Sequence, residues 1–375
     1  MANGETYDVL IIGGGLAGLA CALHLSKNNR KVLLVEKQQY PHHKVCGEYV
    51  SMEVVPYLKS LGIDPFSVGA KRIGNFEISN HKGQLLKTKL PLGGFGISRY
   101  AFDAMLYNAI KDKVTLHFDT VDTVQYHDNH FEVITQGKEV FKADYVVGAY
   151  GKRSNIDVDQ HRKFITEKTP WLAVKAHYEY DFKDDTVALH NFNGGYCGLS
   201  KTEMDTVNAC YLTTYKSFKE FGNIEDFQKQ VLSKNPYLKE FFQNAKPLFK
   251  KPLTIGQISF DKKLPVENHI FMIGDSAGLI HPLCGNGMAM AIHSAKIFSE
   301  FFLKSTKKEC YSRLDLETQY TQLWNKTFSN RLKVGRNIQG MLLHPKATNV
   351  GFSVAKMFPS ILPAIIKRTH GELLV

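Results

Sequence analysis

Three glycines and one acidic residue near the N-terminus have the types and the spacing that bind a dinucleotide. The segment Gly13-Gly14-Gly15-Leu16-Ala17-Gly18 follows the apolar residues 9–12, and Glu36 ends a second apolar run about 20 residues further on. Glycines at these positions permit a tight turn, let the backbone approach a diphosphate and let a helix pack closely on a strand. The N-terminus of that helix attracts phosphates, and the acid binds a ribose hydroxyl. The pattern predicts dinucleotide binding but does not distinguish FAD from NAD.

The next polar segment, Tyr40 to Glu48, combines histidine, lysine and cysteine. His42 and His43 are adjacent, so on a strand their side chains point in opposite directions, which is poor geometry for one metal ion. We therefore predict no metal here. The segment is better interpreted as a loop that passes the cofactor, with Cys46 and Gly47 near its reactive end.

Composition indicates a globular protein of two or three domains. The chain has 375 residues, 43% of them hydrophobic and 22% charged, and its six cysteines form no CxxC pair. Scattered cysteines argue against zinc and a disulfide framework and favour a reducing cytoplasm. A net charge of +11 fits a lysine-rich surface, an acidic partner or an anionic membrane, whereas dispersed basic residues argue against nucleic acid. The apolar residues 9–25 are too few for a membrane span, and the first eight residues lack the cations of a signal peptide.

Hydrophobic periodicity places these motifs on expected elements. After the first strand, helix and strand, we expect a helix at 52–61, a hairpin over 71–90, a flexible return containing Gly93, Gly94 and Gly96, and a helix from Ser98 or Arg99 to Ile110. Further expected strands are 114–118, 120–126, 131–135, 139–141, 143–147, 172–180, 186–192, 206–213 and 269–273, with the segment Asn193 to Gly198 between two of them. Helices are expected at 218–232, 236–245 and 287–303, and through most of the C-terminal region.

Four stretches in this order resemble the FAD-dependent aromatic hydroxylase (p-hydroxybenzoate hydroxylase-like) superfamily. They are the glycine turn with Glu36, Arg99 with Phe102-Asp103, Gly148-Ala149-Tyr150-Gly151, and Gly274-Asp275 with Pro282 and Gly285-Asn286-Gly287. The segment Pro41-x-x-Lys44-x-Cys46-Gly47 is similar to the geranylgeranyl-reductase and halogenase-like branch of that superfamily. The resemblance covers the cofactor part of the chain and says little about the substrate.

The resemblance implies an α/β fold with a discontinuous, Rossmann-like FAD-binding domain of the glutathione-reductase type. We assign residues 1–70, 97–165 and 255–310 to this domain, 71–96 and 166–254 to an inserted antiparallel-sheet substrate domain, and 311–375 to a C-terminal helical region. The residues implied to hold FAD are Gly13, Gly15, Leu16, Ala17, Gly18, Glu36, Lys37, Cys46, Arg99, Val121, Gly151, Asp275, Pro282, Gly285, Asn286 and Gly287.

Individual roles follow from the same resemblance. Glu36 would bind the adenosine ribose, Arg99 the phosphates or the ribityl side, and the backbone of Val121 would face the adenine. Asp275 would accept a hydrogen bond from a ribityl hydroxyl. The helix opened by 285–287 would point its positive end at the flavin pyrimidine ring, where the reduced cofactor carries negative charge. The alternative for Arg99 and Asp275 is a surface cap or a buried ion pair.

The sequence also departs from the family's patterns. Tyr150 stands where the family has the aspartate of Gly-x-Asp-Gly, which weighs against direct reduction by NADPH. Cys46-Gly47-Glu48 replaces the Cys-Gly-Gly of prenyl reductases, and Tyr196-Cys197-Gly198-Leu199-Ser200 replaces their Tyr-x-Trp-x-Phe-Pro run. The Trp-x-Trp-x-Ile-Pro run of tryptophan halogenases is absent, because Trp171 and Trp324 are the only tryptophans.

The function expected first is an FAD-dependent monooxygenase acting on an apolar aromatic or polyketide-like molecule. Catalytic residues remain unassigned, with Cys46 and Tyr196 as candidates near the flavin. The candidate residues of the substrate wall, for each of which a place in the core is the favoured alternative, are Trp171, His177, His190, Phe192 and Tyr196. No second glycine fingerprint is present, so NAD(P)H would dock transiently or a separate reductase would supply electrons.

Two other classes of function stay open. One is reduction of isoprenoid double bonds, and the other comprises flavin-dependent halogenation and a non-catalytic flavoprotein, such as an electron carrier or a membrane-surface module. The tail, 350–366, is apolar, is interrupted by Pro359 and Pro363, and is flanked by lysine and arginine. It is expected to pack on the domain as a helix, with peripheral membrane contact as the alternative.

Overall fold

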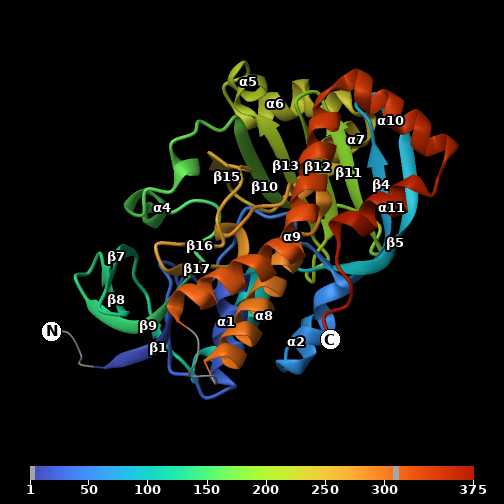
Figure 1. Ribbon diagram of the computed structural model, residues 1–375. Coiled ribbons are helices and arrows are strands. Elements are labelled where there is room, and N and C mark those ends of the chain that lie inside the picture. Colours follow the sequence, from blue (N-terminus) through green and yellow to red (C-terminus); the bar gives the residue numbers. More distant parts are fainter. Residues whose placement is uncertain (1–4, 307–311) are drawn as a thin grey trace.

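The first of two mixed sheets carries the glycine turn. The computed structural model describes residues 5–306 and 312–375 (Figure 1). The strands of this sheet are β1 (Thr6–Ile12), β2 (Val32–Val35), β6 (Thr115–His117), β7 (Val121–His127), β8 (His130–Thr135), β9 (Val140–Gly148), β16 (Val266–Glu267) and β17 (Ile270–Met272). Their order is β16-β17-β9-β1-β2-β6, with β7 and β8 as a side hairpin on β9. The pairs that join β17, β9, β1, β2 and β6 are all parallel.

Parallel pairing explains the continuous apolar runs in the sequence. All four residues of β2 are buried, and so are Val9 to Ile12 of β1, because helices cover this sheet. The crossover helix α1 (Leu16–Ser26) packs against α8 (Gly287–Ser305), so two helices far apart in sequence lie side by side (Figure 1). This arrangement brings their N-termini to the same region of the molecule.

The second sheet forms the other wall of the site. Its strands are β3 (Tyr49–Ser51), β4 (Lys71–Ser79), β5 (Leu85–Gly96), β10 (Trp171–Glu179), β11 (Thr186–Phe192), β12 (Gly195–Lys201), β13 (Val207–Thr214), β14 (Lys246–Pro247) and β15 (Leu253–Gly256). Their order is β14-β10-β13-β12-β11-β4-β5-β3, and β15 pairs with β10. The expectation of an antiparallel sheet needs one correction, because β4 and β11 pair in parallel.

The remaining helices cover the sheets and join them. They are α2 (Val55–Ser60), α3 (Arg99–Ile110), α4 (Asn155–Asp159), α5 (Tyr215–Lys219), α6 (Ile224–Gln230), α7 (Pro236–Asn244), α9 (Arg313–Leu343), α10 (Pro345–Met357) and α11 (Ile361–Thr369). Short 3-10 turns are η1 (Met52–Val54), η2 (Pro65–Val68), η3 (Lys163–Ile165), η4 (Leu232–Lys234), η5 (Gly274–Ser276) and η6 (Pro282–Cys284). The long α9 is fixed to the first sheet by Tyr320, whose hydroxyl donates to the Met272 carbonyl at 2.8 Å.

The expected α/β fold class is confirmed, while several element boundaries were wrong. The expected strands at 139–141 and 143–147 are one strand, β9. The return expected at Gly93 to Gly96 belongs to β5, where a Cβ on Gly94 would lie 2.2 Å from the Tyr49 ring. The segment Asn193 to Gly198 contains the start of β12. Tertiary pairing decided these cases, which local residue preference does not encode.

The long helix expected at 218–232 is also divided. It breaks at Gly222, which has a positive φ of 71°, and Asn223 then caps α6. The helix expected at 52–61 begins as a 3-10 turn before α2. Of the six cysteines, Cys310 lies outside the described residues and the other five are free thiols. In the described part of the chain no single helix is long and apolar enough to cross a bilayer, and only the bent pair 346–357 and 361–369 meets that criterion jointly.

Two histidines in the core make the fold sensitive to acid. The ring of His281 stacks on Phe260 with centroids 3.7 Å apart, and His190 Nδ1 lies 2.8 Å from the Ser79 hydroxyl. Burial lowers the pKa of His281 from 6.5 to about 3 and that of His190 to about 4. Both rings are therefore neutral in the folded state, and unfolding below pH 6.5 takes up protons.

We predict that the free energy of unfolding keeps the contribution of these histidines above pH 6.5 and loses it steadily towards pH 4. The reason is that the unfolded chain binds protons on these rings, whereas the buried rings stay neutral. Each ring contributes on the order of 3 kcal/mol to this loss. Denaturant unfolding at a series of pH values measures it. His281→Phe should flatten the slope, whereas His127→Phe, at an exposed position, should leave it unchanged. An equal slope in all three proteins would contradict the prediction.

Candidate functional site

A single cavity of about 1050 Å³ joins the glycine turn of the first sheet to the inner face of the second. Its first end is lined by the carboxyl ends of β1 and β2 and by the start of α1, at residues 12, 13, 15–17 and 35–38. Its second end is lined by side chains of β4, β5, β11, β12 and β13, and by α11. A cavity at the carboxyl ends of parallel strands is the usual place for a ligand in such a sheet.

The three glycines of the turn have different structural roles. Gly13 has a positive φ of 104°, and a Cβ there would lie 2.6 Å from the Ala149 carbonyl oxygen. A Cβ on Gly18 would lie 1.9 Å from the Gly13 carbonyl oxygen, so Gly18 serves the packing of helix on strand. A Cβ on Gly15 would meet only the Arg99 guanidinium, at 3.7 Å, and would project into the cavity. Gly15 therefore keeps space open for a ligand.

Glu36 shapes the turn from the end of β2. Its carboxylate accepts the Gly14 N–H at 2.6 Å and the Gln38 N–H at 3.0 Å, and it is buried. The Tyr40 hydroxyl donates to the Gly14 carbonyl at 2.6 Å. Glu36 also lines the cavity, so a carboxylate with further acceptor capacity stands where the ribose-binding acid is expected.

Arg99 is held against the glycine turn by a buried ion pair. Ser98 caps α3, and the Arg99 guanidinium donates to both Asp103 carboxylate oxygens, from Nε at 2.8 Å and from Nη2 at 2.7 Å. Lys44 Nζ lies 3.0 Å from the same carboxylate. Burial alone would raise the pKa of Asp103, but Arg99 and Lys44 hold it below its ordinary value. The ion pair foreseen as an alternative is thus present, and it leaves one side of the guanidinium facing Gly15.

The N-terminus of α8 meets the same cavity. Gly285, Gly287 and Met288 line it, and Gly285 has a positive φ of 63°. Neither α1 nor α8 has a side-chain cap or an acidic residue in its first turn. Two helix N-termini therefore present unpaired N–H groups and partial positive charge to one cavity, which suits an extended anionic ligand with a second electron-rich end.

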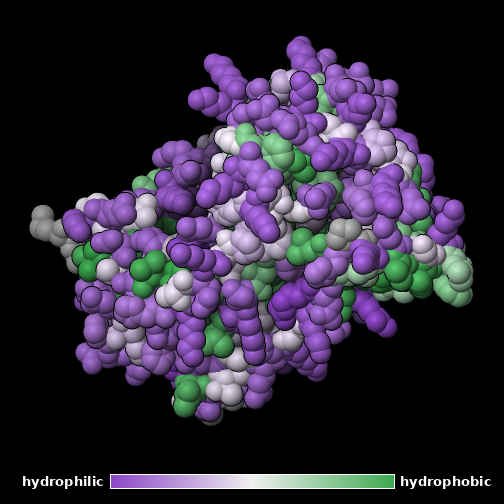
Figure 2. Space-filling view, turned by 90° about the horizontal axis from the view of Figure 1, so that it is seen from above, coloured by the Kyte–Doolittle hydropathy of each residue, from purple (hydrophilic) through white to green (hydrophobic). Residues whose placement is uncertain are grey.

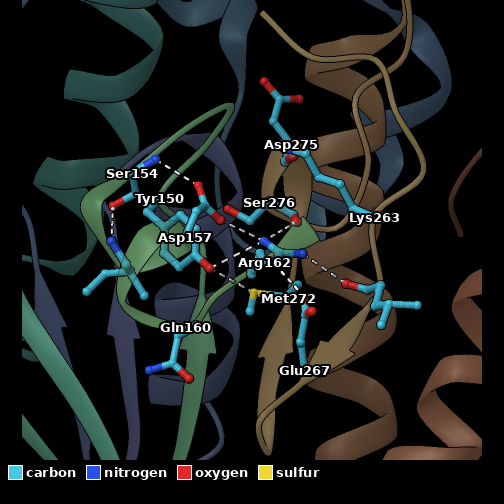
Figure 3. Close-up of polar contacts among 12 residues, drawn as sticks. Tyr150, Ser154, Asp157, Gln160, Arg162, Lys263, Glu267, Met272, Asp275 and Ser276 are labelled. Carbon is cyan, nitrogen blue, oxygen red and sulfur yellow. Dashed lines mark hydrogen bonds and ion pairs between the residues drawn. The ribbon is translucent and has the colours of Figure 1, made fainter. Parts of the chain in front are cut away.

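Tyr150, for which the resemblance implies an aspartate, lies beside a buried arginine (Figure 3). Arg162 donates to the Asp157 carboxylate at 2.9 Å, to Glu267 at 2.6 Å and to the Ser276 carbonyl at 3.1 Å. The Tyr150 hydroxyl lies 3.4 Å from Arg162 Nη1, and burial raises its pKa, so the phenol stays protonated. A neutral phenol therefore stands where the resemblance implies a carboxylate.

The same network sets the backbone next to Asp275. Lys263 Nζ donates to the carbonyls of Lys152 at 3.0 Å and of Asp275 at 2.9 Å, and burial lowers its pKa from 10.5 to about 8. In Figure 3 the Asp275 carboxylate points away from Arg162, and this residue lines the cavity. The network thus fixes the two loops while leaving the Asp275 carboxylate available to a ligand.

A buried charge cluster behind Cys46 was missed by the sequence analysis. The Glu48 carboxylate, fully buried, contacts Lys175 Nζ through one oxygen and His177 Nε2 at 2.6 Å through the other. Burial would raise the pKa of Glu48, but His177 and Lys175 hold it below its ordinary value. Hydrogen bonds from β10, β12 and β13 also reach the backbone carbonyls of residues 44, 46 and 47. The loop beside the cavity is therefore fastened to the second sheet.

The same cluster shows what surrounds the adjacent histidines, His42 and His43, as candidate metal ligands. His43, and not His42, lies near Glu48 and His177, with ligand atoms within 4.8 Å of one another. Lys175 already neutralises this carboxylate, which leaves little attraction for a cation. Residues far apart in sequence form the group, so no local spacing could have revealed it.

Most of the residues predicted to hold the cofactor gather around the cavity. Those that line it are Gly13, Gly15, Leu16, Ala17, Glu36, Lys37, Cys46, Arg99, Val121, Gly151, Asp275, Pro282, Gly285 and Gly287. Gly18 and Asn286 do not line it, because Gly18 packs on Gly13 and the Asn286 amide donates to the Thr369 carbonyl at 2.7 Å. The glycine opening at Gly15, Glu36 and the two helix N-termini together fit a dinucleotide such as FAD.

Of the five candidate residues of the substrate wall, one lines the cavity, and the other four follow the alternative that favoured the core. Tyr196 lines the cavity, and its hydroxyl accepts the Leu283 N–H at 2.9 Å. The other four point elsewhere: Phe192 into the second core, Trp171 against Phe260, His190 to Ser79 and His177 to Glu48. Successive side chains of a strand point to opposite faces of the sheet, so a shift of one residue decides whether a side chain meets the cavity. The apolar residues that do line this end include Phe76, Ile78, Leu90, Leu189, Leu199, Leu212, Ile255, Leu362 and Ile365.

Comparison with known proteins finds an FAD-binding family and several flavin-dependent proteins or reductases that this chain is similar to. A family described as FAD binding domain matches residues 6–300. The chain is 26% identical over 342 residues to digeranylgeranylglycerophospholipid reductase of Methanococcus vannielii, covering 85% of this chain and 82% of that protein. The structure of the flavin-dependent brominase Bmp2 has a TM-score of 0.80 at 18% identity, covering 97% and 93% of the two chains. PqsL of Pseudomonas aeruginosa, described as a probable FAD-dependent monooxygenase, has a TM-score of 0.75 at 15% identity, covering 93% and 100%.

The different roles of the glycines can be separated by one pair of variants. Gly15→Ala should leave the apo-protein as stable as the parent but weaken FAD binding by about 1–3 kcal/mol, because the added methyl group fills the opening. Gly18→Ala should cost roughly 3 kcal/mol or more of folding stability through its clash with the Gly13 carbonyl. Thermal unfolding of the apo-proteins and flavin titration measure the two effects. If Gly15→Ala binds FAD like the parent, the opening does not contact the cofactor.

Proposed function

The chain belongs to the FAD binding domain family, and we propose that this FAD-dependent oxidoreductase is a monooxygenase that hydroxylates an apolar aromatic or polyketide-like molecule. The observation that carries the proposal is the continuity of the cavity. It runs from the glycine opening, past the N-terminus of α8, into a chamber bounded by apolar side chains. Such a chamber accepts a lipophilic substrate and keeps water from the reacting atoms.

Cofactor binding is proposed to divide among four groups of residues. The N–H groups at the start of α1 and Arg99 would bind the diphosphate, and Glu36 the adenosine ribose. Asp275 would hold the ribityl chain, while the start of α8 would lie at the ring. Bound FAD supplies the two-electron chemistry that activates dioxygen and transfers one oxygen atom, with the other released as water. The protein's own part is to orient the substrate and exclude solvent.

Tyr196 is the residue best placed to position the ring region. Its hydroxyl is fixed by the Leu283 N–H, and burial raises its pKa far above its ordinary value. A protonated, oriented phenol at the junction of the two ends supports a positioning role for Tyr196. Cys46, in the loop fastened to the second sheet, lines the same cavity.

A second candidate activity is the reduction of isoprenoid double bonds. It is supported by Cys46 at the cavity wall and by the curated relatives named as digeranylgeranylglycerophospholipid reductases. The replacement of the reductases' aromatic run by Tyr196 to Ser200 favours the monooxygenase. Halogenation and a non-catalytic flavoprotein stay behind both, since no specific observation favours them.

The dependence on dioxygen separates the first two candidates. We expect the FAD-loaded protein, reduced anaerobically, to consume dioxygen faster with a panel of alkylphenols and to return products with one added oxygen atom. Reduction by NADH, NADPH and dithionite is compared by flavin bleaching; slow bleaching by both nicotinamides would indicate a donor protein, as the neutral Tyr150 suggests. Anaerobic products with two added hydrogen atoms would instead assign the reductase.

Gly198 should control the size of the substrate. It stands at the position of the tryptophan in the prenyl reductases' run, and a Cβ there would meet only carbonyl oxygens at 3.7 and 4.0 Å. Gly198→Trp should fill the chamber and raise the KM for the bulkiest alkylphenol accepted by the parent by roughly tenfold or more. Gly198→Ala serves as the control with little change. An unaltered KM with bound flavin retained would place the substrate elsewhere.

A further inference from the structure

The two C-terminal helices form a bent pair whose inner face is buried. The axes of residues 346–357 and 361–369 meet at 114°. Thr348 and Phe352 of α10 are buried, as are Ile366 and Thr369 of α11. Leu362 and Ile365 of the same pair line the cavity. The pair is thus part of the folded domain and closes the apolar end of the site.

The outer face of this pair exposes large apolar side chains. Val350 is 64% exposed, Val354 40%, Met357 71% and Phe358 54%. Their spacing places the first three on one face of α10, opposite Phe352. We call these four residues the apolar tip. Figure 2 shows apolar surface at the right-hand edge of the molecule, where α10 and α11 meet in Figure 1.

Four exposed cations flank the apolar tip along the sequence. Lys346, Lys356, Lys367 and Arg368 are all exposed, and residues 345–370 contain no aspartate or glutamate. Exposed apolar side chains on helices that carry only cations among their charged residues complement a bilayer whose surface is anionic. A second copy of the chain docked on the same two helices would bring its own cations towards these, so the charge pattern disfavours self-association.

We propose that the apolar tip docks on the surface of an anionic lipid bilayer. The bend makes the pair lie in the interface with its apex inserted, while the buried inner face stays packed on the protein. Docking of the apolar tip is independent of the proposed reaction. Leu362 and Ile365 of the same helix pair line the cavity on the inner side. Docking would therefore place the apolar end of the cavity next to the bilayer.

Sedimentation of the FAD-loaded, full-length protein with vesicles tests the proposal. We expect the parent to bind phosphatidylcholine vesicles that contain phosphatidylserine. Lys346→Gln and Lys356→Gln should each bind these vesicles roughly fivefold more weakly than the parent, or weaker still. The double variant Met357→Gln/Phe358→Gln should bind at least about tenfold more weakly. Met204→Gln/Leu314→Gln, which changes two residues that are each 71% exposed elsewhere, is the matched control and should bind like the parent.

Retained flavin absorbance shows that each variant is folded, and no substrate is needed, so failure here is independent of the proposed activity. Absence of parent binding to the anionic vesicles would overturn the proposal. So would equal binding to pure phosphatidylcholine vesicles, or equal loss in the matched control. Sedimentation velocity without vesicles gives a further arm: a parent dimer that the double variant dissolves would identify the apolar tip as an interface between copies instead.

Discussion

The structure depends on one buried carboxylate that joins its two halves. Glu48 accepts the N–H of Arg99 at 2.8 Å, at the start of α3, and contacts Lys175 and His177 of β10 in the second sheet. An ionised carboxylate without solvent persists only when its charge and its hydrogen bonds are satisfied together. Each half therefore needs the other: the first supplies the acid, and the second supplies the cations. The loop that carries Cys46 is fixed in position as a result.

The two halves that Glu48 joins contribute different kinds of groups to the cavity. Groups of the first sheet suit features common to every dinucleotide: the helix N-termini suit phosphate charge, and a carboxylate suits a ribose hydroxyl. The second sheet contributes mostly shape, through apolar side chains and the gap at Gly198. This explains why proteins with the same fold include a brominase and a probable monooxygenase, since the chemistry is carried by residues grafted onto a shared frame.

Sequence reasoning was most successful where chemistry is local. The glycine turn, Glu36 and the cap before Arg99 are each defined by residues within one supersecondary unit, so spacing alone identified them. It failed where chemistry is assembled across the chain. Glu48 and Lys175, or Arg162 and Glu267, lie more than 100 residues apart, and nothing in their neighbourhoods marks them as partners. Phe192 was misplaced because alternation along a strand does not say which face meets a cavity and which meets a second core.

The hydrogen bond from Asn286 to the Thr369 carbonyl has a further consequence. It ties the first residue before α8, where the redox end of the cofactor is expected, to the last turn of α11. Two ligands that both favour the ordered state of one segment are thermodynamically linked, and the linkage is reciprocal. Any surface that steadies α11 from outside would also tighten the grip on the prosthetic group within, and loss of that group would loosen the C-terminus towards proteases.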